Sequence, residues 1–437
     1  MDRSGMSMAE PSNVTETNPA QRLSNPWVVL FTLLVVSIFN FADRYLITGL
    51  IGDIKAEFGV DDGFMGLLIG PAFVVLYVVA GVPIARLADR SSRVKIIAAG
   101  CVLWSACTLA TGFATGPVSL ALARVGVGIG EAAFAAPAYS LLADYFRPER
   151  RGMAYAILGL ATYFGQIAGQ AGGPALGQAF GWHAAFWIMG APGILLGLLV
   201  VLLIREPARI FTGVGAIERV ALGAIVHRLA RTPSYVLMMF AMGCGTLSGV
   251  AFGFWGPELF SRSFAMDPVQ AKSAFALSFG LSGMLGILCF GALSDRLSRK
   301  DKVWPMRLSA MALTCATLMI LGATWAGSFH NALIFAVPAG LLGGGWSVGF
   351  MAMLQYLLPV PYRASATALF LAVTTLLGFF IGPWLAGEIS ARMGDHGDAL
   401  KIGLTCVIPT GLLGGWLAWL ASRRIEADRV ALGAQDV

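Results

Sequence analysis

The segment ARLADRSSRVK at Ala85–Lys95 recurs in outline as GALSDRLSRKDK at Gly291–Lys302. Each copy follows a long apolar run and carries an Asp-Arg pair, and the aspartates of the two pairs, Asp89 and Asp295, lie 206 positions apart. This spacing is close to half of the 437-residue chain. The recurrence therefore indicates an internal duplication.

A second motif repeats at nearly the same spacing. The segment GQAGGPALG at Gly169–Gly177 resembles GFFIGPWLAG at Gly378–Gly387, and their prolines, Pro174 and Pro383, lie 209 positions apart. Two different motifs at one offset predict two six-helix halves. Such duplication is typical of secondary transporters, whose halves rock about a site at their interface.

The composition places most of the chain in a membrane. Hydrophobic residues make up 57% of the sequence and charged residues 12%, whereas an average soluble domain carries about 25% charged residues. Crossing about 30 Å of hydrocarbon takes about 20 mostly apolar residues in a helix. Barrel strands are excluded because the runs are too long and do not alternate. We expect twelve helical spans: 26–50, 63–87, 95–115, 118–143, 152–180, 184–204, 234–260, 271–293, 304–325, 331–358, 362–391 and 401–421.

The distribution of basic residues predicts the orientation. If both termini are cytoplasmic, 23 of the 30 Lys and Arg residues lie in the tails, the inner loops or the inner ends of spans, five lie in the outer loops or the outer ends of spans, and two lie well within spans. This bias follows the positive-inside rule. We expect a multi-pass protein of the cell (inner) membrane and, since no continuous basic stripe exists, no binding of nucleic acid.

The same runs divide the chain into expected domains. The linker carries apolar positions, among them Ile217, Val220 and Leu229, that could line an interfacial helix, and a solvated linker helix is an equal alternative. The expected divisions are a disordered cytoplasmic tail (1–25), an N-terminal six-helix bundle (26–204), a cytoplasmic linker (205–233), a C-terminal six-helix bundle (234–421) and a cytoplasmic tail (422–437).

The duplicated loop segment resembles the cytoplasmic loop motif of the major facilitator superfamily, although Ala85 and Ser92 replace two glycines in the first copy. The segment RVGVGIGEA at 124–132 resembles the span-four motif of that superfamily. The Gly-Pro pattern around Pro174 resembles one often seen in exporters. The resemblance covers residues 26–421 and implies an all-α membrane fold of two pseudo-symmetric bundles.

A narrower resemblance is to the Spinster family. The blocks that carry it are FADRYLITGLIGDIKAEFGVDD at Phe41–Asp62, GIGEAAFAAPAYSLLADYFRPERRG at Gly128–Gly152, IREPARI at Ile204–Ile210 and TPSYVLMMF at Thr232–Phe240. This resemblance implies a proton-driven transporter of lysolipids or sphingosine-phosphate-like amphiphiles. A multidrug or organic-anion exporter of the same fold is the alternative.

Four ionisable residues are expected to meet inside the first half. Arg124 and Glu131 lie two turns apart on one face of the fourth span, and Asp43 and Arg44 lie at similar depth in the first. A charge costs from about 3 to more than 10 kcal/mol at the bilayer centre. Such residues either lock two spans together or take part in transport, and we favour transport.

Each of the four receives a role in this hypothesis. Glu131 is expected to carry the proton, since burial in a dry place favours the neutral carboxyl group. Asp43, the second proton-coupling candidate, is expected to stay ionised beside Arg44 and Arg124. Either arginine could then hold an anionic head group through a two-pronged contact.

Further substrate and gating candidates come from both halves. Two amides of the fifth span, Gln166 and Gln170, are costly to leave in lipid. Glu258, at the outer end of the seventh span, is either a gate residue or a wet terminus, and we favour the wet terminus. The apolar second half should hold the tail of an amphiphile, and its expected lining residues are Phe252, Phe254, Trp255, Met351, Met353, Gln355, Phe370 and Phe379.

The loop motifs are expected to lock the cytoplasmic side. By resemblance, Asp89 reaches the start of span eleven and Arg93 pairs with Asp144 at the end of span four. The alternative is a merely solvated loop. The expected lock residues are Asp89, Arg90, Arg93, Asp144, Asp295 and Arg296.

An enzyme is not expected. Three of the four histidines fall at outer loops and one in the linker, so no nucleophile–base pair or metal cluster can form within the spans. The chain has no Walker motif, and the six cysteines lack disulfide or zinc spacing. We expect no cofactor besides a proton as the coupling ion, and a monomer that binds a small amphipathic substrate within the lipid bilayer.

Overall fold

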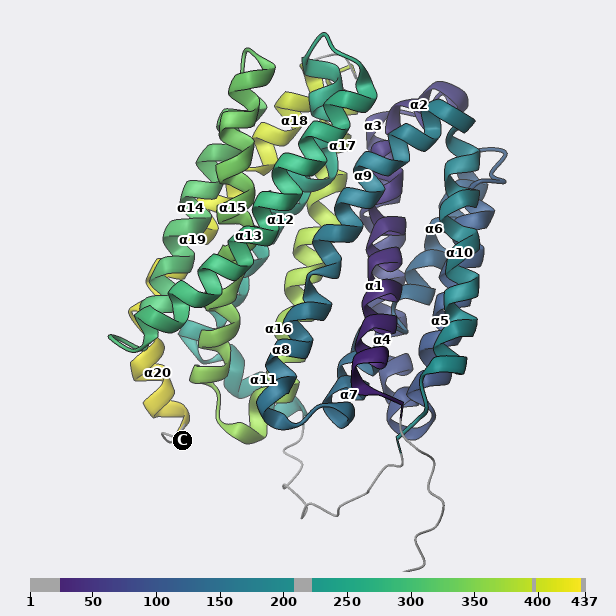
Figure 1. Cartoon of the computed structure of the whole chain (residues 1–437). Coiled ribbons are helices and arrows are strands. Elements are labelled where there is room, and N and C mark those ends of the chain that lie inside the picture. The colour runs from purple at the N-terminus through teal and green to yellow at the C-terminus, as the bar shows by residue number, and fades with distance from the viewer. Residues whose placement is uncertain (1–23, 208–221, 395–397, 434–437) are drawn as a thin grey trace, which may run out of the picture.

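The computed structural model describes residues 24–207, 222–394 and 398–433, and all regular structure in these ranges is helical. Figure 1 shows two groups of helices standing side by side. The first group comprises α1 (Pro26–Gly49), α2 (Ile51–Phe58), α3 (Asp62–Ile69), α4 (Pro71–Arg90), α5 (Arg93–Thr111), α6 (Pro117–Glu131), α7 (Ala135–Tyr145), α8 (Pro148–Gly159), α9 (Ala161–Phe180) and α10 (Trp182–Leu203).

The second group follows the linker and is the counterpart of the first. Its members are α12 (Pro233–Ser263), α13 (Pro268–Ser298), α14 (Trp304–Thr324), α15 (Phe329–Leu357), α16 (Val360–Thr375), the π-helical turn η1 (Leu376–Ile381), α17 (Gly382–Arg392), α18 (Ala399–Val407) and α19 (Thr410–Ser422). Two short helices, α11 (Leu222–Ala230) and α20 (Ile425–Leu432), lie at its base (Figure 1). We call the end that carries α11 and α20 the inner end, in keeping with the charge bias, and the opposite end the outer end.

Among the described residues, eleven helical segments are long and apolar enough to cross a membrane. The twelfth expected span, 152–180, forms α8 and α9, which run end to end alongside α1 (Figure 1). This region falls below the hydropathy of a typical span because α9 carries three glutamines and five glycines in its 20 residues. A helix with that composition suits packing between other helices better than contact with lipid.

Side-chain caps fix several helix starts. The Asn25 side chain accepts a hydrogen bond from the Trp27 N–H at 2.9 Å, and the Asp61 side chain accepts one from the Phe64 N–H at 2.8 Å. Asp267 does the same for α13. Each cap satisfies an amide that has no partner inside its helix.

Glycines bring the two repeated helices close to their neighbours. A Cβ built on Gly169 of α9 would lie 2.5 Å from the Ala42 carbonyl oxygen of α1, and one on Gly165 would lie 2.4 Å from the Cβ of Phe41. In the second half, a Cβ on Gly378 would lie 2.2 Å from Thr246 of α12. The repeated Gly-Pro segments thus make equivalent close contacts in both halves.

The linker and the C-terminal tail each contain a short helix. Within the linker, α11 buries Ile225 and Leu229, whereas Ile217 and Val220 lie outside the described residues. Within the expected C-terminal tail, residues 425–432 form α20, which buries Ile425 against the second half. Of the expected N-terminal tail, only residues 24 and 25 belong to the described part of the chain.

Candidate functional site

A buried ion pair lies inside the first half at the level of the two cavities described below. Arg44 of α1 donates to Oε2 of Glu131 at the end of α6, from Nε at 3.1 Å and also from Nη2. The Glu131 side chain has no exposed surface and that of Arg44 is 11% exposed. Glu131 thus pairs with an arginine of another helix, although Arg124 lies on the same helix as Glu131.

Asp43 and Arg124 differ from the expected arrangement. The carboxylate of Asp43 accepts a hydrogen bond from Thr108 Oγ1 at 3.2 Å, whereas Arg124 reaches the main-chain carbonyl of Asp43 at 3.5 Å. Within the described ranges, neither Arg44 nor Arg124 forms an ion pair with the Asp43 side chain. Adjacent residues on a helix point in different directions, so Arg44 and Asp43 face different neighbours. Thr108, which the sequence did not single out, is the contact of this carboxylate.

Aromatic rings surround the Arg44 guanidinium group. Its Cζ lies 4.6 Å from the ring centre of Phe73, 5.2 Å from that of Phe41 and 5.4 Å from that of Tyr77. Arg124 also approaches Phe73, at 5.8 Å. Rings at these distances stabilise a cation that has left water. None of these three aromatic residues was singled out from the sequence.

The ion pair borders a small cavity. The residues that line a space of about 110 Å³ include Arg44, Glu131, Tyr77, Tyr139 and Thr162 of α9. The wall is mixed, with two charged groups and several hydroxyls beside aromatic rings. A polar or anionic group of a ligand would find donors here.

A larger and more apolar cavity lies between the two halves. Its volume is about 270 Å³, and Thr162 lines it as well. The first half contributes four residues, Tyr45, Thr162, Tyr163 and Gln166. The second half supplies the remaining wall from α12, α13, α14, α15 and η1, with Phe279, Trp346 and Phe379 as its large rings.

The two glutamines have different places. Gln166 lines the larger cavity and donates from its side-chain amide to Oε1 of the Gln170 side chain at 3.2 Å. Gln170 is fully buried and donates to Thr48 Oγ1 of α1 at 3.3 Å and to the Gly253 carbonyl of α12 at 2.7 Å. Gln170 therefore joins the two halves rather than facing the cavity.

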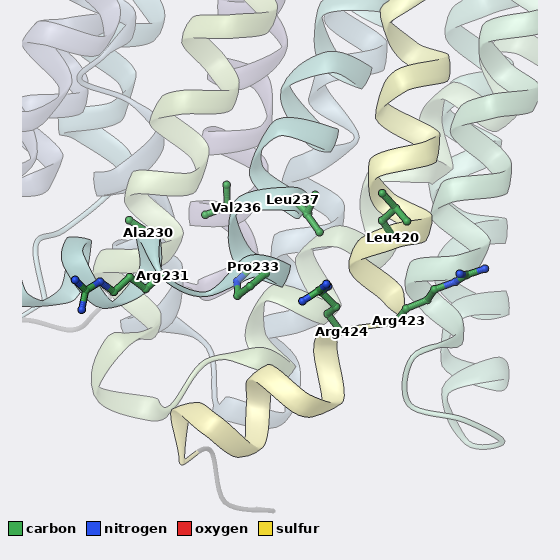
Figure 2. Close-up of a pocket in the computed structure, with 8 residues that line it drawn as sticks. All are labelled: Ala230, Arg231, Pro233, Val236, Leu237, Leu420, Arg423 and Arg424. Atoms are coloured by element: carbon green, nitrogen blue, oxygen red, sulfur yellow. The ribbon is translucent and has the colours of Figure 1, made fainter.

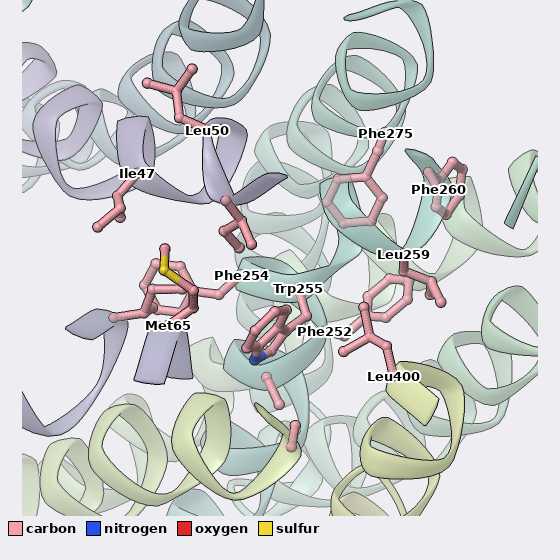
Figure 3. Close-up of a cluster of buried hydrophobic side chains, with 14 of the residues drawn as sticks. Ile47, Leu50, Met65, Phe252, Phe254, Trp255, Leu259, Phe260, Phe275 and Leu400 are labelled. Atoms are coloured by element: carbon pink, nitrogen blue, oxygen red, sulfur yellow. The ribbon is translucent and has the colours of Figure 1, made fainter. Parts of the chain in front are cut away.

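Most of the expected apolar lining residues pack elsewhere. Figure 3 shows Phe252, Phe254 and Trp255 inside a buried cluster where α12 meets the first half and α13, and none of the three lines the larger cavity. Trp255 donates its ring N–H to the Pro383 carbonyl at 2.8 Å, and Phe254 packs 5.0 Å from Tyr45. Their side chains point toward helix contacts because α12 is surrounded on several sides.

The expected lining residues near the inner end of the second half do not line the larger cavity either. Gln355 is exposed and donates to Thr367 at 3.0 Å, and Phe370 packs against Tyr235 with ring centres 6.0 Å apart. Met351 and Met353 pack in the inner cluster of the second half. Of the apolar candidates, Phe379 lines the larger cavity, from the π-helical turn η1.

A network of buried ion pairs closes the outer end. Asp62 of α3 has no exposed side-chain surface and accepts two hydrogen bonds from Arg262 of α12, both at 2.7 Å. It also accepts from Ser390 of α17 at 2.7 Å and from Lys55 of α2 at 2.6 Å. Since Arg262 and Ser390 belong to the second half, this carboxylate joins both halves.

A second set of contacts extends the network. Glu258 accepts from Arg262 at 2.8 Å and pairs with Lys272 of α13 at 3.1 Å. Lys272 also donates to the Gly49 carbonyl at the end of α1, at 2.9 Å. The expectation that Glu258 is a wet terminus is therefore wrong, because packing of α12 against α1 and α13 buries it. The sequence does hold one signal for a buried ion pair here, because Lys272 lies within the apolar run that follows Pro268.

Close packing of α3 and α17 supports this closure. A Cβ built on Gly66 would lie 2.8 Å from the Pro383 carbonyl oxygen, and one on Gly387 would lie 2.3 Å from the Asp62 carbonyl oxygen. Backbones that approach so closely exclude water from the ion pairs. The outer end is therefore shut by both packing and charge.

A third ionic cluster lies at the inner end of the first half. Arg93 pairs with Asp144 at 2.6 Å, as the resemblance implied, and with Glu206 at 2.8 Å. Glu206 also accepts from the Val94 N–H at 3.0 Å and from Ser92 at 2.9 Å, so it caps α5. Burial acts to raise the pKa of Glu206, but these hydrogen bonds outweigh burial and hold the pKa below its usual range.

The other expected lock residues make fewer contacts. Arg90, Asp295 and Arg296 are exposed at the inner end. The side chain of Asp89 lies outside the described part of the structure, and so does its expected contact with the start of α16. The structure thus places the loop motifs at the inner surface, where a lock between the halves could form in another conformation.

The described residues contain no group of three or more His, Cys, Asp or Glu side chains that could hold a metal ion. The geometry instead offers a central cavity between two helical halves, an ion pair beside it and a closed outer end. This combination defines a membrane transporter that works by moving two halves about a central site.

Comparison with known proteins agrees with this class. Residues 33–383 match the Major Facilitator Superfamily, and the chain belongs to this family of secondary transporters. An MFS-type efflux pump from Mycolicibacterium smegmatis is 29% identical over 429 residues, which cover 96% of this chain and 99% of that protein. Human protein spinster homolog 1 is 28% identical over 437 residues, covering 92% of this chain and 81% of that protein.

A solved structure shares the fold. The crystal structure of a bacterial homolog to the human lysosomal transporter Spinster, in an inward-facing and unoccupied conformation, superposes with a TM-score of 0.82. Its sequence is 24% identical, and the match covers 92% of this chain and 98% of that one. The expected superfamily, the likeness to Spinster proteins and the absence of an enzyme class are thus confirmed.

Proposed function

We propose that this secondary transporter moves an amphipathic anion, such as a lysophospholipid or a sphingosine-phosphate-like lipid, and couples the movement to protons. The observation that carries the proposal is a pair of cavities that share Thr162 in their linings, one bordered by Arg44 and Glu131 and the other mainly apolar. An amphiphile has the same division between a charged head and a hydrocarbon tail.

Arg44 is the proposed contact of the head group. Its planar guanidinium group presents several N–H donors in a fixed geometry that suits phosphate. In the structure these donors are directed at Glu131. A phosphate can take the place of this carboxylate when Glu131 is neutral, so proton binding and substrate binding are linked.

The proposed tail site is the larger cavity. Its second-half wall includes Phe279, Trp346 and Phe379 beside several glycines and small side chains. Ligand sites of this kind are mostly apolar, with few polar groups that fix orientation. Gln166 and Tyr163, on the first-half side, would hold the region where head and tail join.

Glu131 and Asp43 are the proposed proton carriers. Within the described residues, Oε1 of Glu131 and Oδ1 of Asp43 are buried and have no hydrogen-bond partner. An ionised carboxylate in that condition is costly, and protonation removes the cost. In the proposed cycle, protonation of Glu131 releases Arg44, and deprotonation restores the ion pair when the halves have moved.

The two halves, 26–204 and 234–421, are the proposed moving units, and the inner loop residues Asp89, Asp295 and Arg296 would lock the opposite conformation. The outer network around Asp62 would open in that conformation. We further propose that the protein acts as a monomer in the cell (inner) membrane. Cross-linking of the purified protein in lipid would reveal a stable oligomer if one exists.

Transport in proteoliposomes tests the proposal. Vesicles containing the protein would be given labelled lysophosphatidylglycerol under an imposed pH gradient, and uptake would be followed with time. We expect uptake to depend on the gradient in the unchanged protein. Glu131→Gln should abolish the gradient dependence, and Arg44→Lys should lower uptake at least tenfold because lysine lacks the planar donor set.

Matched controls separate these effects from damage to the fold. Glu149→Gln makes the same chemical change at an exposed glutamate of the inner surface and should transport normally. Thermal unfolding in detergent reports whether each variant is folded. If folded Glu131→Gln keeps the full pH dependence, the proton assignment is wrong.

The second candidate is an exporter of drugs or organic anions. The likeness to an MFS-type efflux pump favours it, and the cavity, mainly apolar in lining, could take flat aromatic compounds. The same vesicles would be offered a cationic dye and an aromatic sulfonate in place of lysolipid. Transport of these compounds without transport of lysolipid would favour the exporter over the lipid transporter.

A further inference from the structure

A basic groove lies at the inner end of the second half, outside the transport cavity. Its volume is about 890 Å³, and it lies between the start of α12 and the end of α19. Figure 2 shows three arginines along one level, with apolar side chains above them. The residues that matter here are Arg231, Val236, Leu237, Leu420, Arg423 and Arg424.

The three arginines have free donors. All are exposed, and in the described part of the chain none forms an ion pair with a carboxylate. The two carboxylates of α20 that lie nearest in sequence are engaged elsewhere. Asp428 accepts from the Ser234 N–H at 2.7 Å, and Glu426 accepts from Tyr356 at 3.0 Å.

The apolar wall of the groove continues onto the surface that faces the bilayer. Val236, Leu237 and Leu420 are partly exposed within it. Farther along α19, one and two turns from Leu420, Trp416 is 58% and Leu413 48% exposed. Apolar side chains this exposed on a spanning helix face lipid, and tryptophan is common near the membrane interface.

We propose that this groove binds an anionic phospholipid of the cytoplasmic leaflet. The phosphate contacts the arginines, and the acyl chains lie over Val236, Leu237 and Leu420 toward the exposed face of α19. Figure 2 shows the arginines spread along a row rather than gathered at one point, so a lipid with its phosphate near Arg424 leaves other donors for glycerol oxygens or a second phosphate. Basic sites between spanning helices at this level hold anionic head groups.

Charge and geometry favour a lipid over a soluble anion. Arg231 follows α11, whereas Arg423 and Arg424 follow α19, so one head group would connect the ends of two helices that the chain order separates. The apolar wall of the groove continues onto the exposed face of α19, where the acyl chains of a lipid gain contacts that a soluble anion lacks. The site is distinct from the cavity for substrate, since the lining residues of the two have no member in common.

Native mass spectrometry and thermal unfolding would test the site. The purified full chain in neutral detergent would be titrated with phosphatidylglycerol, with phosphatidylcholine and with inorganic phosphate. We expect phosphatidylglycerol to bind at least tenfold more tightly than phosphatidylcholine and to raise the unfolding temperature. Each arginine near such a surface contributes about fivefold to affinity, so the triple variant R231Q/R423Q/R424Q should bind phosphatidylglycerol about 100-fold more weakly.

A matched control removes the same charge from the same end. Arg299, Lys300 and Lys302 are exposed after α13, and the variant R299Q/K300Q/K302Q should keep the affinity for phosphatidylglycerol. If the triple variant does not fold, the single variant R424Q replaces it in the titration. R424Q should bind phosphatidylglycerol about fivefold more weakly than the parent protein. Equal binding of both lipids, an unchanged affinity in the groove variants, or equal stabilisation by inorganic phosphate alone would each overturn the proposal.

Discussion

The replacement Asp62→Asn should open the outer end of the protein. In the structure, the carboxylate of Asp62 accepts two hydrogen bonds from Arg262 and one from Ser390, all across the interface between the halves. Asparagine has the same size but only one acceptor oxygen, and its amide would face the cations of Arg262 and Lys55. The change therefore removes the charge that joins the halves while it preserves volume.

The expected magnitude follows from these contacts. A hydrogen bond to a charged group contributes about 1.5–3 kcal/mol, and breaking a buried ion pair costs about 3–5 kcal/mol. The Lys272 contact with the Gly49 carbonyl remains in the variant and keeps part of the closure. We estimate a loss of about 3 kcal/mol, which shifts the equilibrium toward an open outer end by about two orders of magnitude.

Spin labels at the outer ends would measure this shift. Ala56 in α2 and Ala265 after α12 are exposed on opposite halves. Labelled cysteines at these positions, in a background without the six native cysteines, would report the distance between the halves by pulsed electron resonance. We expect one short distance in the parent and a large longer-distance population in Asp62→Asn.

The neighbouring residue supplies the control. Asp61 is exposed and caps α3 through the Phe64 N–H, a role that asparagine also fills. Asp61→Asn should therefore leave the distances unchanged. Identical distance distributions for the parent and Asp62→Asn would refute the idea that this carboxylate holds the outer end closed.

Three further predictions concern other parts of the chain. Thr162→Trp should block both cavities and abolish lysolipid uptake without loss of the folded state by circular dichroism. Gly169→Val should lower the free energy of unfolding by about 3 kcal/mol or more, because its Cβ meets the backbone of α1. A Cβ at Gly172 on the same helix meets nothing within 4 Å, so Gly172→Val should lower the free energy of unfolding by less than about 1 kcal/mol. Chemical denaturation of both variants measures the difference. The depressed pKa of Glu206 means that its stabilising contribution is present above the unfolded-state pKa of about 4.3 and is lost as the pH falls through the folded value. Glu206→Gln should therefore be less stable than the parent by about 1 kcal/mol at pH 7, the value of a lost helix cap, and in thermal unfolding this difference should shrink as the pH falls toward the depressed folded pKa. A variant with the same pH profile as the parent would contradict the last prediction.

The sequence predicted the architecture well because the bilayer leaves few choices. Apolar runs of about 20 residues have to form helices when no water can satisfy their backbone, and the repeated motifs around Asp89 and Asp295 revealed the two halves. The weakest span by hydropathy, α9, was still recognised from its length and from the repeat around Pro174. Composition alone would have missed it, since its polar residues contact other helices.

The sequence identified the ionisable residues of the central site but did not predict which of their side chains contact one another. Burial cost identified Arg44, Arg124, Glu131 and Asp43 as residues that need partners. Which side chains meet depends on how α1 is rotated relative to α6, and a single sequence holds no signal for that angle. For this reason the pairing of Glu131 with Arg44, and of Asp43 with Thr108, came from the structure.

The outer network was missed for a different reason. Asp62, Arg262 and Glu258 lie near helix ends, where charged residues are usually solvated. Their burial arises from the close contact of α3 with α17, which depends on glycines such as Gly66 and Gly387 from distant parts of the chain. Only the assembled halves bring these positions together.

An ionic outer closure suits a protein that has to open repeatedly. While the outer end is shut, Asp62 and Arg262 are shielded from water and their ion pair is strong. Once the halves separate, water solvates both groups, and an exposed ion pair is worth only about 0–1 kcal/mol. Opening therefore replaces contacts within the protein by contacts with water. An apolar closure would instead expose hydrocarbon on opening, at a free-energy cost of about 25 cal/mol for each Å². The free energy lost when the pair breaks is thus partly regained as hydration of the open form, so in the proposed cycle the binding of substrate at Arg44 needs to favour that form only modestly to move the equilibrium.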